Sequence, residues 1–192
     1  MFIPKNKIVV YTCITNSYDI LFEPKYVSNN IEYICFIDKN DLIKFKSNVW
    51  KCREIPQELL NLSKIKQQRI LKICPHKWLS EYDISIWIDA NLQIIGNINY
   101  LLSLCDLNRY SFYTRKHTNR TCIYSEGYAC VKKYKETYLL VNEILTRYRN
   151  ENYPVNNGLG ETGIIIRKHN DTKCKILCNT WATELIKYSA RD

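Results

Sequence analysis

Short runs of apolar and β-branched residues, each ending in polar residues, most limit what this chain can fold into. Residues 8–12 read IVVYT, 33–37 read YICFI, 84–88 read ISIWI and 164–167 read IIIR. Strands with one solvated face alternate between apolar and polar residues, whereas these runs are apolar almost throughout. The pattern predicts strands that are buried on both faces, as in a sheet covered by helices.

Helical patterns separate these runs. Ser63 is predicted to cap a helix that ends before Pro75, and apolar residues at three- and four-residue steps predict one long helix from about 127 to 150. Further helices are expected at 97–104 and around Cys174–Leu185, and a further strand at 111–114. Strands alternating with helices predict an α/β fold over residues 1–192, with a mostly parallel central sheet and helices on both faces.

Composition restricts the class of protein. The chain has 192 residues, and 28 Lys plus Arg against 19 Asp plus Glu give a net charge of +9. No apolar stretch approaches the roughly 20 residues that cross a bilayer, and nine scattered cysteines without a C-x-x-C pair indicate reduced thiols. We therefore expect a cytoplasmic globular protein without a transmembrane segment. Its basic surplus fits nucleic acid, an anionic membrane or a phosphorylated ligand.

The segment Gly158–Gly163 reads GLGETG and matches the G-x-G-x-x-G pattern of nucleotide-binding loops. In dinucleotide-binding proteins that pattern follows a strand and opens a helix, whereas here it follows a helical segment and precedes a strand. The context therefore excludes a dinucleotide-binding loop and predicts a tight turn near a pocket.

Asp89 and Asn91 follow the third strand directly, where ligands of α/β sheets usually bind. Along an extended chain, residues two apart point the same way, so both oxygens can address one Mn²⁺ or Mg²⁺ ion. Arg69 and Lys72 lie about one helical turn apart, and both can reach a diphosphate there. The alternatives are that Asp89 only starts a turn and that the cations form a solvated helix face.

Residues 68–91 carry a resemblance to a known family. The segment QRILKICPHKWLSEYD followed by ISIWIDAN resembles the segment leading into the D-x-D signature of GT-A glycosyltransferases. More narrowly, it resembles the glycosyltransferase-like domain family of plant mucilage-related proteins, with relatives in bacterial and large-virus surface-glycan proteins. Supporting pieces in the same order are YTCITNSYD at 11–19, CFID at 35–38, RTCIYSE at 120–126 and SARD at 189–192.

The resemblance implies a metal-dependent transferase that moves a sugar, such as a UDP-linked hexose or deoxyhexose, to a glycan acceptor. The donor-binding residues it implies are Thr12, Thr15, Tyr18, Asp38, Arg69, Lys72, Asp89 and Ala90. The metal ligands it implies are Asp89, Asn91 and His169, although Asn91 stands where a second Asp is usual. The family pattern continues past Asp192, which leaves open that the sequence is one domain of a longer protein.

The catalytic carboxylates expected for this chemistry are Glu161, in the glycine segment, and Asp192, with Glu126 as a third candidate. Each is also compatible with an ordinary solvated acid. A rival function is a non-catalytic basic module that binds nucleotides or nucleic acid. We expect no nucleic-acid partner, because many of the 15 tyrosines fall on predicted helical core positions rather than between exposed cations.

Overall fold

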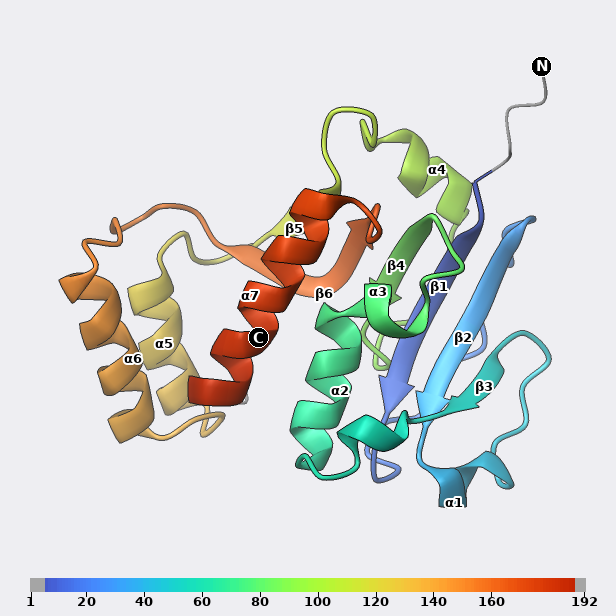
Figure 1. Cartoon of the computed structure of the whole chain (residues 1–192), viewed down its shortest axis with the longest axis horizontal. Coiled ribbons are helices and arrows are strands. Elements are labelled where there is room, and N and C mark those ends of the chain that lie inside the picture. The colour runs from blue at the N-terminus through green and yellow to red at the C-terminus, as the bar shows by residue number, and fades with distance from the viewer. Residues whose placement is uncertain (1–5, 189–192) are drawn as a thin grey trace.

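The computed structural model describes residues 6–188, which form a six-stranded sheet in the order β3-β2-β1-β4-β6-β5 surrounded by helices (Figure 1). The strands are β1 (Ile8–Ile14), β2 (Ile31–Ile37), β3 (Lys51–Glu54), β4 (Ile84–Ile88), β5 (Phe112–Lys116) and β6 (Gly160–Arg167). The predicted α/β fold with a mostly parallel central sheet is confirmed.

Eight helical segments connect and cover the strands in this part of the chain. They are α1 (Lys39–Leu42), the 3-10 helix η1 (Gln57–Leu59), α2 (Lys64–Ile73), α3 (Pro75–Trp78), α4 (Ile98–Ser103), α5 (Ile123–Lys132), α6 (Tyr138–Asn150) and α7 (Thr172–Tyr188). Over residues 6–188, none of these helices has the length and apolar character needed to span a membrane.

Strand direction decides which residues meet. Strands β3, β2, β1 and β4 are parallel neighbours, whereas β6 runs antiparallel to both β4 and β5. We call the edge of the sheet at which β1, β2 and β4 end the carboxyl edge. Because β6 runs the other way, it begins at this edge and ends at the opposite one. The glycine segment therefore lies at the carboxyl edge, and the residues after Arg167 do not.

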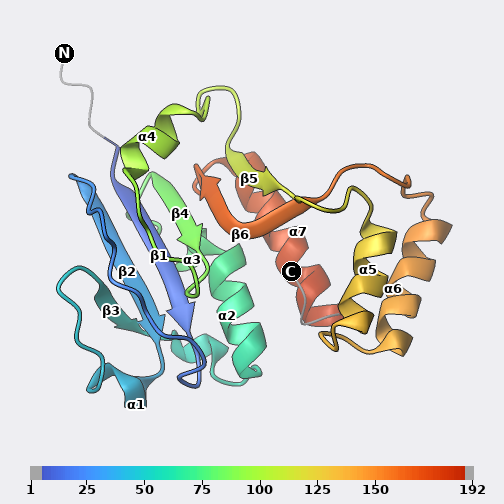
Figure 2. The ribbon, with the colours of Figure 1, turned by 180° about the vertical axis from the view of Figure 1, so that it is seen from behind.

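Two apolar layers cover the sheet. One contains side chains of α2 and α7 packed on alternate residues of β1, such as Val9 and Tyr11. The other contains the intervening residue Val10 and side chains of α4 with the segments around it. Figures 1 and 2 show α2 and α7 on one face of the sheet, while α5 and α6 form a hairpin beside it. The runs are apolar throughout because both of their faces are buried.

The predicted helix over 127–150 is wrong: the structure has two helices, α5 and α6, joined by a turn. Tyr134 lies in this turn with φ of +54° and a 97% exposed side chain, so it is not part of a core stripe. Thr137 then caps α6, because its side chain accepts a hydrogen bond from the backbone N–H of Leu140. Apolar spacing alone did not reveal the break, since both helices keep the same periodicity.

Arg167, at the end of β6, joins the sheet to the end of α2. Its side chain is fully buried, and its guanidinium donates to the backbone oxygens of Ile73, at 3.0 Å, and Lys72, at 2.7 Å. It also lies 2.5 Å from the hydroxyl of Tyr11, which itself donates to the Lys72 oxygen. The last carbonyl groups of a helix lack partners within the helix and carry its negative dipole end, so a buried cation stabilises them.

Replacing Arg167 with Met is expected to lower the free energy of unfolding by about 3 kcal/mol, because buried carbonyl oxygens lose a charged donor. Urea denaturation measures the change. Arg149→Met is the matched control, since Arg149 is exposed on α6 and its loss is expected to cost less than about 0.5 kcal/mol. Equal denaturation midpoints for the two variants would contradict the structural role of Arg167.

Candidate functional site

Asp89 lies at the carboxyl edge, directly after β4. Its backbone N–H donates to the oxygen of Gly163 at 2.9 Å, and its own oxygen accepts from the N–H of Leu92 at 2.9 Å. The first bond holds the residue against the start of β6, and the second makes residues 89–92 a turn. The carboxylate is 30% exposed, so it is held by the fold and still open to a ligand.

A buried ammonium fixes this carboxylate. The side chain of Lys72, in the last turn of α2, is 1% exposed, and its Nζ lies 3.3 Å from Asp89 Oδ1 and 3.1 Å from Thr162 Oγ1. The indole Nε1 of Trp87 donates to the same Oδ1 at 2.7 Å. The predicted proximity of Lys72 to the strand-end aspartate is therefore present, and Oδ1 is shared by two donors.

Asp19 interacts electrostatically with Asp89 of this pair and with Arg69. Burial raises the pKa of Asp19, the negative charge of Asp89 raises it further, and the guanidinium of Arg69 opposes the rise. Asp19 thus belongs to the same group of charges, although it was not among the predicted site residues. Its place among the polar residues that follow β1 was the available signal, because the carboxyl ends of β1 and β4 meet at one edge.

An irregularity in β6 brings its first residues to Asp89. The pairing of β5 with β6 shifts between Thr114 and Arg115, and the Thr114 hydroxyl donates to the oxygens of Glu161 and Ile164 at 2.7 and 3.0 Å. Gly163 lies inside the irregular stretch, and a Cβ on it would meet Asp89 Oδ2 at 3.6 Å. The glycine segment is thus part of the site through its backbone and Thr162, rather than as a phosphate loop.

The expected donor-binding residues after β1 and β2 form a neighbouring region. Asp38 accepts from the backbone N–H of Asn16 at 2.6 Å and forms an ion pair with Lys64, so its carboxylate holds the loop after β1 in place. Asn16 and Ser17 both have positive φ in that loop. A groove of about 390 Å³ lies here, lined by residues that include Asn16, Asp38, Lys64, Glu54 and Ile55.

The remaining donor-binding predictions differ in accessibility. Tyr18 is 87% exposed, and the oxygen of Thr15 accepts its N–H at 3.1 Å. Thr12, inside β1, and Ala90 are buried at 1% and 4% exposure. Donor binding by Thr12 and Ala90 therefore stays a prediction.

The structure does not assemble the expected metal ligands. His169 follows the end of β6 at the opposite edge, where its fully buried ring hydrogen-bonds to the oxygen of Leu79 at 2.9 Å. Its inclusion in the metal set was wrong, because antiparallel β6 carries His169 away from Asp89. The alternation argument for Asn91 also fails, because residues 89–92 form a turn rather than an extended strand.

A divalent ion prefers several oxygen ligands, commonly from carboxylates. Over residues 6–188, no group of three or more His, Cys, Asp or Glu side chains is arranged to hold one. Asp89 Oδ1 already accepts from Lys72 and Trp87. The described residues therefore do not fit the Mn²⁺ or Mg²⁺ site implied by the sequence.

Glu161 does not join the site through its carboxylate. The guanidinium of Arg115, its neighbour on β5, donates to Glu161 Oε2 at 2.6 and 3.1 Å. This interaction lowers the pKa of Glu161, which is the wrong direction for a general base at neutral pH. Glu126 is likewise paired, with Arg120. Asp192, the other predicted catalytic residue, lies outside the described residues.

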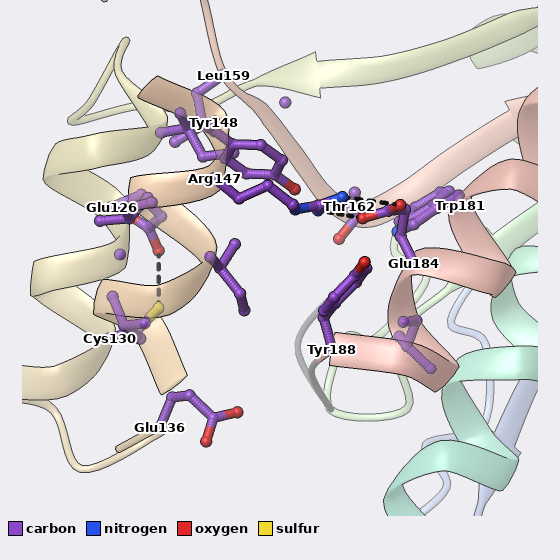
Figure 3. A pocket seen from close by; sticks show the side chains of 17 residues that line it. Glu126, Cys130, Glu136, Arg147, Tyr148, Leu159, Thr162, Trp181, Glu184 and Tyr188 are labelled. Carbon is purple, nitrogen blue, oxygen red and sulfur yellow. Dashed lines mark hydrogen bonds and ion pairs between the residues drawn. The ribbon is translucent and has the colours of Figure 1, made fainter. Parts of the chain in front are cut away.

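A largely apolar cavity of about 370 Å³ opens beside the site, between the α5–α6 hairpin, α7 and the start of β6 (Figure 3). Thr162, which contacts Lys72, is also one of its lining residues. Arg147 reaches from α6 to an ion pair with Glu184 of α7, and its guanidinium lies 4.2 Å from the ring centre of Tyr188. The cavity thus shares a wall with the charged site.

A family model described as TOD1/MUCI70, glycosyltransferase-like domain, matches residues 1–192. The chain belongs to this family. The resemblance found in residues 68–91 is therefore confirmed. Family membership makes the group around Asp89 the candidate centre of a glycosyltransferase-like domain, since it lies at the carboxyl edge.

One solved structure supports the fold of this TOD1/MUCI70 domain, and a second is less similar. The apo structure of the bifunctional glycosyltransferase WbbM superposes with a TM-score of 0.56 at 15% identity, covering 98% of this chain and 35% of that one. Mouse xyloside xylosyltransferase 1, also in its apo form, gives 0.47 at 9% identity, covering 95% and 76%. The chain thus spans about a third of WbbM. Curated protein sequences give no match.

His169 is expected to make stability depend on pH. Burial lowers its pKa from 6.5 to about 4, so between these values the unfolded chain binds a proton that the folded chain does not. Stability is therefore lost as pH falls from about 6.5 to about 4. His169→Gln removes this contribution, so the urea midpoint of the variant should fall less over that range than that of the wild type.

His76→Gln is the matched control for this measurement. The pKa of His76 is also lowered by burial, but its ring is less enclosed and its Nε2 contacts Asn179 at 3.0 Å. We expect the pH-dependent difference from the wild type to be smaller than for His169→Gln. A difference between wild type and His169→Gln that stays constant from pH 7 to pH 4 would show that His169 does not titrate as described.

Proposed function

We propose that this domain transfers a sugar from a nucleoside diphosphate sugar, a UDP-linked hexose or deoxyhexose, to a hydroxyl group of a glycan acceptor. The observation that carries the proposal is the buried Lys72 ammonium holding Asp89 at the carboxyl edge of a glycosyltransferase-like domain, with Arg69 and Asp19 beside it. Ligands of open α/β sheets bind at this edge, and the cations there suit a diphosphate.

The proposed donor lies along the carboxyl edge. The groove near Asp38 is the candidate place for the nucleoside, and the diphosphate then lies toward Arg69 and Asp89. The loop after β1 forms one wall, since the Asp38 carboxylate holds its Asn16 N–H. In this arrangement Asp38 shapes the nucleoside site by fixing a loop, and the exposed ring of Tyr18 is available for contact.

During transfer a bond forms between the acceptor oxygen and the sugar carbon, and the bond from that carbon to the diphosphate breaks. Negative charge develops on the leaving phosphate oxygen, which takes the proton of the acceptor hydroxyl. Preorganised positive charge in a partly enclosed site stabilises that change. Arg69 is half-buried and can contact the phosphate. Lys72 is fully buried against Asp89, so it acts through its fixed charge rather than by contact. The prediction of Mn²⁺ or Mg²⁺ stays a prediction.

The acceptor is proposed to enter from the side of the cavity at Thr162. The aromatic rings of Trp181, Tyr148 and Tyr188 line that cavity, together with the Arg147–Glu184 ion pair. Aromatic faces and paired polar groups are chemically suited to a sugar with one apolar face. Because Thr162 also contacts Lys72, an acceptor bound there would lie next to the proposed diphosphate site.

UDP binding tests the proposal directly. A ligand that binds only the folded state raises stability, by about 2.7 kcal/mol at 100 times its Kd. We expect UDP and UDP-sugars to raise the melting temperature of the wild type, and Arg69→Met, which removes the cation proposed to contact the phosphate, to abolish most of the rise. Glu143→Ala, which removes an exposed carboxylate from α6, should keep it. Salt-sensitive binding to any oligonucleotide with no response to UDP would favour the basic binding module instead.

Glu161→Gln distinguishes a salt-bridged surface acid from a general base. Since Glu161 is paired with Arg115, we expect sugar transfer to stay within about twofold of the wild type once a donor and acceptor are found. A general base contributes about 10²–10⁴-fold to the rate. The opposite result would be a loss of about 10²–10⁴-fold in the sugar-transfer rate of Glu161→Gln, with donor binding intact and with a normal rate in Arg115→Gln. That result would support the catalytic role predicted for Glu161 from the sequence.

A further inference from the structure

The carboxylate of Asp89 is in contact with a fixed cation, the ammonium of Lys72. Its Oδ1 accepts from the ammonium of Lys72 at 3.3 Å and the indole of Trp87 at 2.7 Å. These donors approach a single oxygen, so the carboxylate cannot present Oδ1 to another cation without losing both. Only Oδ2 remains, and it lies beside Gly163, where a Cβ would be 3.6 Å from it. Bidentate binding of a divalent ion by Asp89 is therefore incompatible with this arrangement.

The Lys72 ammonium is held in place from several directions. Its side chain is 1% exposed, and its Nζ contacts Thr162 Oγ1 at 3.1 Å and lies 5.8 Å from the ring centre of Trp87. Its backbone oxygen accepts from both Arg167 and Tyr11. A lysine on the surface would move aside for an incoming ion, whereas this one is fixed at its backbone and its tip.

The Lys72 ammonium already occupies a cation position at Asp89 Oδ1. A cation bound between Asp89 and a diphosphate would lie close to a buried ammonium, and like charges repel strongly where water is excluded. The same ammonium already balances the carboxylate, so a diphosphate approaching the edge does not meet an uncompensated anion. Arg69, which interacts with the neighbouring Asp19, adds a second, half-buried cation.

We propose that this site binds the diphosphate of its donor without a divalent ion, and that Lys72 supplies the fixed positive charge in place of the metal. The inference rests on the proposed function, since it concerns how the same donor is held. Lys72 is a positioning residue in this scheme: it orients Asp89 and sets the local charge, and Arg69 contacts the phosphate.

Isothermal titration of the full chain with UDP tests the inference. The wild type is titrated after treatment with EDTA and again after addition of Mn²⁺, and the two Kd values are expected to agree within about threefold. Lys72→Met, which keeps the length of the side chain and removes its charge, is expected to weaken UDP binding at least about tenfold without metal. Because that variant frees Asp89 Oδ1, added Mn²⁺ is expected to restore part of its affinity.

Lys66→Met is the matched control. Lys66 is also on α2, but its Nζ donates to the backbone oxygen of Ile186, away from Asp89, so UDP binding should not change. Urea denaturation of both variants establishes that they fold. The comparison of EDTA with Mn²⁺ uses only the wild type, so it remains decisive if Lys72→Met does not fold.

The outcomes separate the two proposals. Wild-type binding that falls at least about tenfold on chelation would overturn the metal-free site and leave the transferase proposal intact. Folded Lys72→Met that binds UDP as tightly as the wild type would overturn the role of Lys72. A wild type that binds neither UDP nor UDP-sugars, with or without Mn²⁺, would overturn the proposed donor itself.

Discussion

The contact between Arg167 and the end of α2 connects the stability of the fold to the geometry of the site. The guanidinium holds the backbone oxygen of Lys72, and the side chain of the same lysine holds Asp89. Both cations are buried, so neither can move without breaking hydrogen bonds that water cannot replace. The direction of the Asp89 carboxylate is therefore set by the core, rather than by the loop on which it lies.

The reversal of β6 decides which sequence segments share the site. Its antiparallel pairing with β4 brings Gly163 to the backbone N–H of Asp89 and carries His169 to the far edge. A parallel strand would have done the opposite, with His169 near Asp89 and the glycines away from it. Because β6 is antiparallel, the backbone of Gly163 and the hydroxyl of Thr162 lie beside Asp89. His169, which was a candidate metal ligand, lies at the other edge.

The fold was largely predictable because its strands are apolar on both faces, and such runs are recognisable without an alignment. Strand direction was not, since an apolar run such as Ile164–Ile166 pairs equally well either way. β3 was not predicted because it is the outermost strand of the sheet, and its sequence, KCRE, is partly exposed there. In the site, Asp89 and Lys72 followed from local spacing, whereas Asp19 joins them only through contacts between distant segments.

A tethered ammonium and a bound metal ion place different demands on the rest of a donor site. The ammonium is present before the donor arrives, so binding requires no prior ion and orders fewer groups. The ammonium carries one positive charge, whereas a divalent ion carries two. The position of the ammonium relative to Asp89 is also fixed by the fold. Under this proposal a diphosphate needs a second cation, and half-buried Arg69, which interacts with Asp19, is the candidate for that role. In the proposed metal-free site, the rigid charge of Lys72 therefore orients Asp89, and the charge of Arg69 meets the phosphate.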